Sequence, residues 1–158
     1  MKMKIAPIRP SFLDLVRREG IDDLGQPVKR VVAEGGEPCR DVLRRAVAGE
    51  ALILASYSPF AKPGPYREFG PVFVLATPDI EAVDHDRLPM DPGADSSYLK
   101  KQFVLRAYGE DESILDAVMV TPGDADLVVE RLLSAADVAF IHARFPLYGC
   151  FAARIERG

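Results

Sequence analysis

Histidine, arginine and cysteine side chains gather in two segments near the C-terminus, residues 138–145 and 149–156. Both segments have the length and composition of strands, and only a short loop joins them. Side chains of a strand alternate between its two faces, so the polar residues of the two segments share one face of a predicted hairpin. That polar face holds His142, Arg144, Cys150 and Arg154.

The opposite face of this hairpin is wholly apolar, and we predict that it faces the core. It comprises Ala139, Ile141, Ala143, Phe145, Phe151, Ala153 and Ile155. A three-residue loop would place Arg144 opposite Cys150, with about 5 Å between their Cβ atoms. His142 would then lie opposite Ala152 and diagonal to Cys150. We therefore expect the apolar set to be buried, and His142 and Arg144 to point away from it.

The polar face allows three interpretations, which the sequence leaves open. One is a solvated sheet face, because antiparallel sheets commonly have one face in water. Another is a site for a small anion, with arginines as charge-assisted donors and His142 titrating near neutral pH. The third is an enzyme in which Cys39 or Cys150 acts with His142, or a zinc site made from the same residues. The spacing of these residues matches no metal motif.

Further arginine, tyrosine and cysteine residues lie at the ends of predicted strands or in an adjoining loop. They are Cys39, Arg40, Tyr57, Tyr66, Arg106 and Tyr108. Polar side chains are costly to bury without partners, so a sheet face rich in them stays wet or binds a ligand. We predict that these residues and the polar hairpin face line one concave surface, roofed by the loop 58–66. Arginines near a histidine favour a carboxylate or phosphate ligand.

The elements that must position these residues are short, and strands outnumber helices. The predicted strands are 4–8, 28–33, 51–57, 70–76, 103–108, 114–120 and the two of the hairpin. One helix is expected over 11–18, ended by Gly20, and another over 122–134, with Thr121 as N-cap and Pro122 in its first turn. This order predicts an α+β fold with a mainly antiparallel sheet and helices packed on one face.

The predicted apolar stripe of the second helix comprises Val128, Leu132 and Ala136, flanked by Val129 and Leu133. Prolines interrupt the chain in two places, which we expect to be loops. The first is residues 58–66, and the second is a long acidic connection over residues 77–97. A connection of that length inside a small domain is usually functional or mobile.

Length and charge narrow the class of protein. The 158 residues suit a single domain over residues 1–158. A net charge of −4 argues against a nucleic-acid-binding protein that relies on a basic field. The chain has no apolar stretch long enough for a membrane span and no signal peptide, so we expect a cytoplasmic protein with no membrane association.

Cofactor and redox motifs are absent from the sequence. It holds no phosphate-binding loop, nucleophile elbow or paired Cys-x-x-Cys, so no cofactor is expected. Its two cysteines, Cys39 and Cys150, are expected to stay reduced in the cytosol, without a disulfide. A small anionic molecule is the partner we expect, and a partner protein or a homodimer stays open. The sequence does not decide between a binding protein and an enzyme.

Six short motifs follow one another from residue 28 to the C-terminus. They are Pro38-Cys39-Arg40, Gly49-Glu50 leading to Tyr57, Pro65-Tyr66 followed by Gly70-Pro71-Val72-Phe73-Val74, Leu105-Arg106-Ala107-Tyr108, Ile141-His142-Ala143-Arg144, and Gly149-Cys150-Phe151-Ala152-Ala153-Arg154. As an ordered set they resemble the bacterial domain of unknown function 1203 family. Phe145-Pro146 departs from the Asn-Ala expected there. The resemblance implies a small bacterial protein and brings no activity with it.

Overall fold

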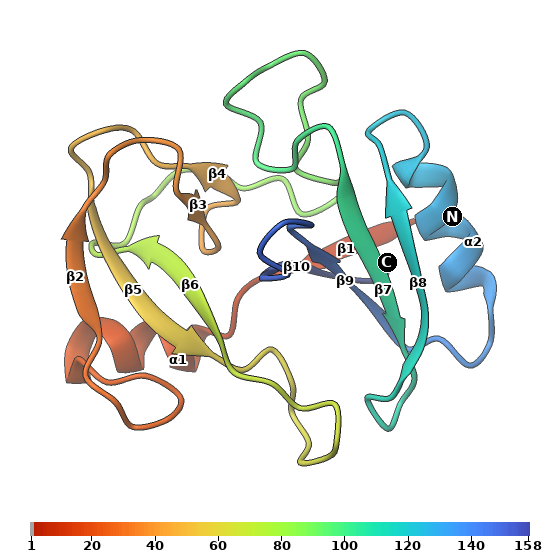
Figure 1. Cartoon of the computed structure of the whole chain (residues 1–158), viewed down its shortest axis with the longest axis horizontal. Coiled ribbons are helices and arrows are strands. Elements are labelled where there is room, and N and C mark those ends of the chain that lie inside the picture. The colour runs from red at the N-terminus through yellow and green to blue at the C-terminus, as the bar shows by residue number, and fades with distance from the viewer. Residues whose placement is uncertain (1) are drawn as a thin grey trace.

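Strand-forming segments dominate the chain, and the computed structural model, which describes residues 2–158, arranges them in two five-stranded sheets with two short helices (Figure 1). Sheet I has the order β1-β10-β9-β7-β8, and every neighbouring pair in it is antiparallel. Its strands are β1 (Met3–Ala6), β7 (Phe103–Tyr108), β8 (Ile114–Val120), β9 (Phe140–Arg144) and β10 (Phe151–Arg157).

Sheet II has the order β2-β5-β6-β3-β4 and lies beside sheet I in Figure 1. Its strands are β2 (Lys29–Val32), β3 (Pro38–Cys39), β4 (Arg44–Arg45), β5 (Ala51–Tyr57) and β6 (Gly70–Leu75). The pair β3–β6 is parallel and the other pairs are antiparallel. The mainly antiparallel architecture is thus confirmed, but the strands form two sheets where the sequence predicted one.

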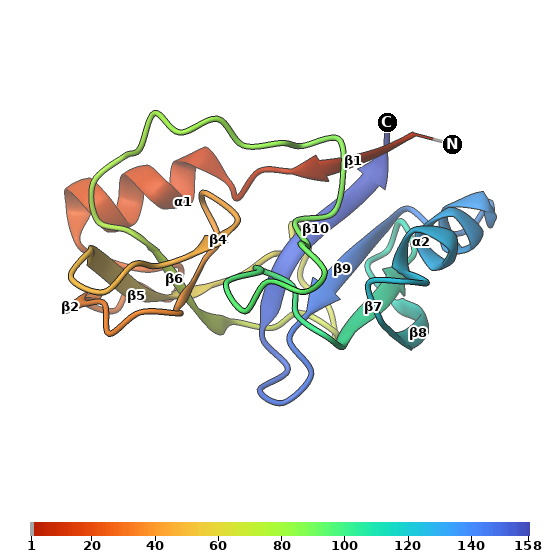
Figure 2. The same cartoon turned by 90° about the horizontal axis from the view of Figure 1, so that it is seen from above.

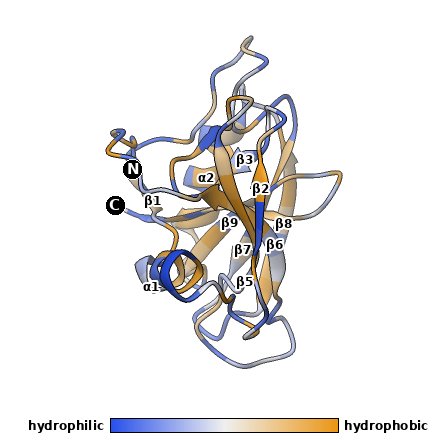
Figure 3. Cartoon of the chain, turned by 90° about the vertical axis from the view of Figure 1, so that its left-hand side faces the viewer, coloured by the Kyte–Doolittle hydropathy of each residue, from blue (hydrophilic) through white to orange (hydrophobic). Residues whose placement is uncertain are grey.

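The two helices pack on different sheets. Helix α1 (Pro10–Asp14) continues into a π-turn, η1 (Leu15–Glu19), which ends at Gly20 with φ 67°, as predicted. Its apolar side packs on β5 and β6 of sheet II, whereas α2 (Ala125–Ser134) packs on β8 and β9 of sheet I (Figure 2). Figure 3 shows both hydrophilic and hydrophobic residues on α1, as expected of a helix with one buried side.

Helix α2 begins later than the sequence predicted. The Asp124 carboxylate accepts the Thr121 backbone N–H at 2.7 Å and the Thr121 hydroxyl at 3.1 Å. Residues 121–124 therefore form a turn, and Asp124 rather than Thr121 is the N-cap. The expected N-cap signal is present, but it marks the turn before the helix.

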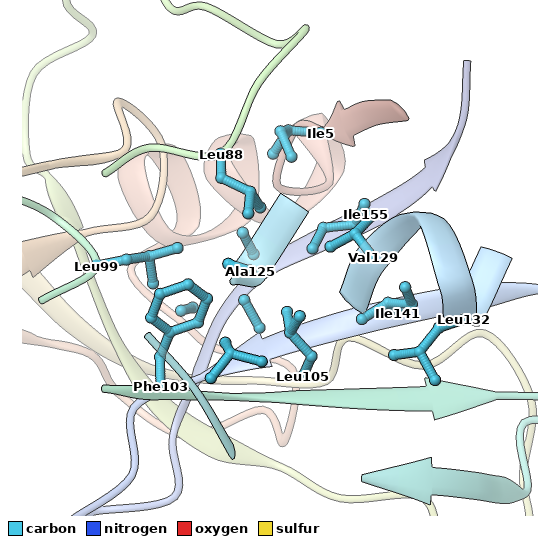
Figure 4. Packing of buried hydrophobic residues seen from close by; sticks show 14 of the residues in the cluster. Ile5, Leu88, Leu99, Phe103, Leu105, Ala125, Val129, Leu132, Ile141 and Ile155 are labelled. Atoms are coloured by element: carbon cyan, nitrogen blue, oxygen red, sulfur yellow. The ribbon is translucent and has the colours of Figure 1, made fainter. Parts of the chain in front are cut away.

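The main core lies between sheet I and α2 and also includes part of the long connection (Figure 4). Residues 76–102 contain none of the named helices or strands, so the connection predicted over 77–97 is confirmed and extends a few residues further at each end. Leu88, Tyr98 and Leu99 are nevertheless buried in this core, and Tyr98 Oη donates to Ala152 O at 2.7 Å. Part of the connection is therefore packed onto sheet I.

Candidate functional site

The β9–β10 hairpin differs in register from the prediction. The observed pairs are Phe151 with Arg144, Ala153 with Ala143, Arg154 with His142, and Ile155 with Ile141. The Phe145 N–H donates to Cys150 O at 3.0 Å, so the loop has four residues instead of three and shifts the register by one. A β-bulge between Phe151 and Ala153 adds a second shift.

The two shifts add up to two residues, so from Ala153 onwards the side chains lie on their predicted faces. Phe151, which precedes the bulge, does not. Ala153 and Ile155 are buried on the Ile141 face, as expected. Phe151 was predicted on that face and instead packs on His142, with ring centroids 5.0 Å apart. The predicted positions of Arg144 opposite Cys150 and of His142 opposite Ala152 are wrong.

The polar face of the hairpin is buried, so the interpretation as a solvated sheet face is wrong for its central residues. His142 is 0% exposed and Arg144 is 3% exposed, although both point away from the main core, as predicted. Aromatic rings surround the imidazole, with centroids 4.8–5.2 Å from it. They belong to Phe60, Tyr108, Phe140 and Phe151.

The His142 imidazole is neutral and carries its hydrogen on Nε2. Arg144 Nη2 lies 3.4 Å from His142 Nδ1, and since a guanidinium can only donate, Nδ1 must accept. Burial, together with the positive charges of Arg154 and Arg106, holds the pKa of His142 well below 6.5. The Nε2 atom is buried and has no hydrogen-bond partner among residues 2–158.

Tyr108 and Arg106 extend the cluster across β7. In the sheet register Arg106 pairs with His142, and Tyr108 pairs with Phe140. Tyr108 Oη accepts from Arg106 Nη1 at 3.4 Å and from Arg144 Nη2 at 3.5 Å. Burial raises the pKa of Tyr108, so its hydroxyl keeps its proton. That proton has no acceptor within the part of the chain that the structure describes.

Carboxylates neutralise two of the three arginines on this face. Arg144 forms an ion pair with Glu68, and Arg154 Nε lies 2.7 Å from a Glu156 oxygen. Arg106 has no carboxylate within ion-pair distance among the described residues 2–158. The three arginines, together with Tyr108 and His142, form what we call the donor cluster. It comprises Arg106, Tyr108, His142, Arg144 and Arg154.

The predicted roof is present, but the single concave surface is not. Phe60 lies over Tyr108 and His142, with ring centroids 5.3 and 5.2 Å away. The Glu112 carboxylate anchors the loop by accepting the backbone N–H groups of Ala61 and Lys62 at 3.1 and 2.7 Å. The cavity under this loop, about 250 Å³, is lined by Tyr66 but by no other predicted site residue.

Two predicted residues, Cys39 and Tyr57, have structural surroundings outside the donor cluster. Cys39 is fully buried in a separate apolar cluster of sheet II, and burial raises the pKa of its thiol to about 12. Tyr57 packs between Phe12 and Phe151, and its Oη accepts from the backbone N–H of Arg9. The structure therefore does not bring either residue to the donor cluster.

Arg40 and Cys150 lie at the border of the donor cluster. Arg40 directly follows β3 of sheet II, and its buried guanidinium donates from Nε to Phe151 O of β10 in sheet I at 2.9 Å. Cys150 is partly exposed, and both it and Cys39 are free thiols. No hydrogen bond links Cys150 to His142 among the described residues.

Sequence reasoning missed two residues that complete the site, Phe60 and Glu68. Both come from the segment between β5 and β6, which drops below the two sheets in Figure 1. Glu68 is the only acidic residue between Glu50 and Asp79. A lone carboxylate in a segment expected to cover arginines was therefore a usable signal, whereas nothing in the sequence marked Phe60 as the covering ring.

Residues 2–158 contain no group of three or more histidine, cysteine or acidic side chains that could hold a metal ion. The zinc interpretation therefore has no structural support. No helix within the same residues is both long and apolar enough to cross a membrane.

Fold and site together define a protein of two mainly antiparallel sheets, with a buried, arginine-rich face on one of them. A family model described as "Protein of unknown function (DUF1203)" matches residues 36–157. The chain therefore belongs to this family, as the ordered motifs indicated. Comparisons with curated proteins and with solved structures found no match.

Proposed function

We propose that this protein binds a small anion, a carboxylate or a phosphate group, at the donor cluster. The observation that carries the proposal is an excess of donors. His142 Nε2–H and the Tyr108 hydroxyl proton have no acceptor among residues 2–158, and Arg106 has no carboxylate. Buried donors without acceptors cost free energy, and an anion would satisfy these donors together.

The burial pattern suggests the order of contacts. Arg106 and Arg154 are half-buried on either side of His142 in the sheet register, so a ligand would meet their guanidinium groups first. His142 is fully buried among four aromatic rings, so contact with Nε2 requires at least one of these rings to move. Two guanidinium groups and a neutral N–H donor suit the oxygens of a carboxylate or phosphate.

A thermal-shift measurement with Arg106→Gln tests the proposal. Inorganic phosphate and succinate are the probes, at ionic strength held constant with sodium chloride. A ligand at a hundred times its dissociation constant stabilises the folded state by about 2.7 kcal/mol, which raises the Tm by roughly 5–11 °C in a chain of this size. Arg106→Gln is expected to lose most of the shift.

Arg131→Gln is the matched control for this measurement. Arg131 lies on α2, where its guanidinium is exposed and only 3.9 Å from Asp116. The Arg131→Gln substitution removes one positive charge, as Arg106→Gln does, but at a place away from the donor cluster. It is therefore expected to leave the ligand-induced rise in Tm unchanged. Equal shifts in both variants, or an equal shift from sodium chloride alone, would contradict the proposal.

A cysteine–histidine enzyme is the second candidate, and the partly exposed Cys150 is the observation that favours it. We predict that iodoacetamide modifies Cys150 in the native protein and leaves Cys39 unmodified, because Cys39 is buried with a raised pKa. Mass spectrometry of peptides from the native protein measures both. A Cys150 rate that collapses in His142→Ala would favour the enzyme over the binding protein.

We also propose three further properties of the protein that the sequence led us to expect. These are a cytoplasmic location, a bacterial origin and a single domain over residues 1–158. The free state of both thiols is consistent with a reducing compartment.

A further inference from the structure

Glu68 places a carboxylate of the chain itself on the donor cluster. It forms an ion pair with Arg144 Nη2, and the Arg144 side chain is 3% exposed whereas the Glu68 side chain is 41% exposed. The same Nη2 atom lies 3.5 Å from Tyr108 Oη and 3.4 Å from His142 Nδ1. The Glu68 carboxylate therefore occupies part of the place where a bound anion would meet the donors.

The segment that carries Glu68 has few polar contacts with the rest of the chain. Residues 61–67 and Phe69 are exposed. Within the segment 63–69, the backbone N–H of Arg67 donates to Gly64 O at 3.1 Å. Among residues 2–158, the ion pair with Arg144 is the only hydrogen bond or ion pair that ties 63–69 to other parts of the fold. Glu68 can therefore leave Arg144 without breaking a further polar contact.

The difference in burial between the two partners favours an exchange of carboxylates. Glu68 is already partly in water, so its release into solvent costs little. Arg144 is buried, and a buried charge left without its partner is strongly destabilising. A ligand carboxylate that takes the place of Glu68 keeps the guanidinium paired throughout.

Arg106 is the reason why a ligand carboxylate can compete with the one that the chain supplies. Tyr108 Oη accepts from Arg106 Nη1 at 3.4 Å and from Arg144 Nη2 at 3.5 Å, so both guanidinium groups lie within hydrogen-bond distance of one atom. Glu68 pairs with Arg144 and leaves Arg106 without a carboxylate among the described residues. A ligand placed between the two arginines gains charge-assisted hydrogen bonds from both.

We propose that the ligand of the donor cluster is a small carboxylic acid, whose carboxylate displaces Glu68 from Arg144. Glu68 is then a competitor built into the chain, and it sets the affinity of the site. The inference rests on the proposed binding of an anion, and it narrows the ligand to the chemical group that the fold itself places on Arg144.

Glu68→Gln removes the competing charge and tests the exchange. The apparent affinity of the wild-type chain is reduced by the fraction of molecules in which Glu68 has left Arg144. If nine molecules in ten hold the ion pair, the variant binds succinate about tenfold more tightly than the wild type. NMR titration at constant ionic strength measures both dissociation constants. Inorganic phosphate is the second probe and is expected to gain less than succinate.

Glu81→Gln is the matched control for this titration. Glu81 is 40% exposed and pairs with Arg44, which keeps Glu50 as a second partner. The substitution removes the same negative charge away from the donor cluster, so the dissociation constant for succinate is expected to stay at the wild-type value. Circular dichroism checks that both variants are folded.

Backbone order parameters from nitrogen-15 relaxation test the displacement in the wild-type chain itself. The amides of Glu68 and Phe69 are expected to be rigid without ligand, at about 0.85, and to fall below about 0.6 in saturating succinate. In Glu68→Gln they are expected to be flexible with or without succinate. An ion pair with a structural role alone would not loosen when the ligand binds.

The outcomes separate the exchange from anion binding as such. A wild-type chain that binds succinate through Arg106 while Glu68 stays rigid would overturn the exchange and leave the proposed function intact. So would a folded Glu68→Gln with the wild-type dissociation constant, or an equal gain in Glu81→Gln. A gain for phosphate as large as that for succinate would overturn the restriction to carboxylic acids. If neither the wild type nor Glu68→Gln binds either probe, the exchange and the proposed function are both wrong.

Discussion

Leu133→Ala is expected to lower the free energy of unfolding by about 2–5 kcal/mol. Leu133 lies on the inner side of α2 and is 1% exposed, packed in the main core with Ile141 and Ile155. The substitution removes buried apolar surface and leaves a cavity between the helix and sheet I. Chemical denaturation measures the loss, and the Tm should fall by roughly 2–4 °C for each kcal/mol.

Leu127→Ala is the control for this prediction, because it makes the same substitution on the same helix. Leu127 is 70% exposed, so its replacement is expected to change the free energy of unfolding by less than about 0.5 kcal/mol. Similar losses in the two variants would show that α2 does not pack on sheet I through the side that holds Leu133.

The same helix shows how far the sequence pattern could place the core. The pattern predicted a stripe centred on Val128, Leu132 and Ala136. The structure buries Ala125, Val129, Leu132 and Leu133, while Val128 is only partly buried and Ala136 lies beyond the helix end. Apolar residues at neighbouring helical positions allow two overlapping stripes, and contacts with β8 and β9 select between them.

Strands were predictable where alternation and turn residues agreed. Three strands match their predicted bounds to the residue: β5, β7 and β8. The strands β3 and β4 were missed, because two residues are too few to show a period. The division into two sheets was not predictable, since alternation identifies a strand but does not specify its partner.

For the candidate site, the alternation of side chains along the strands correctly placed these polar residues on one face. It could not show which residues cover that face. Arg106, Tyr108, His142 and Arg154 come together because they share a face on neighbouring strands. The burial of that face depends on the loop residue Phe60 and on the bulge in β10. Both are local features outside the strand pattern, so the sequence left open whether this face stays wet or binds a ligand.

The stability of the wild-type protein is expected to fall as the pH drops below about 6.5, because of His142 alone. Burial and the neighbouring charges of Arg154 and Arg106 hold the pKa of His142 well below 6.5 in the folded state. Below pH 6.5 the unfolded chain therefore binds a proton that the folded chain does not, and folding becomes less favourable as the pH falls.

No group that faces His142 reverses this loss of stability at low pH. Arg144 lies against Nδ1, Arg106 and Arg154 flank the ring, and Tyr108 stays protonated. None of them offers a negative charge that would favour the imidazolium, and the Glu68 carboxylate is paired with Arg144. Each pH unit therefore costs up to about 1.4 kcal/mol, until the pKa of folded His142 is reached.

His142→Phe removes the titrating group and keeps an aromatic ring among the four that surround it, so the variant should lose this part of the pH dependence. Urea denaturation of both proteins at several pH values gives the difference in slope. Acid also protonates the Glu50 carboxylate, whose pKa Arg44 lowers to about 2 in the folded state. This protonation lowers the stability of both proteins equally, chiefly below about pH 4.5, and so does not affect the comparison. His85→Gln replaces the other histidine of the chain and should keep the wild-type slope. If His142→Phe keeps that slope as well, His142 is not held neutral, and the excess of donors that supports anion binding no longer includes an uncharged imidazole.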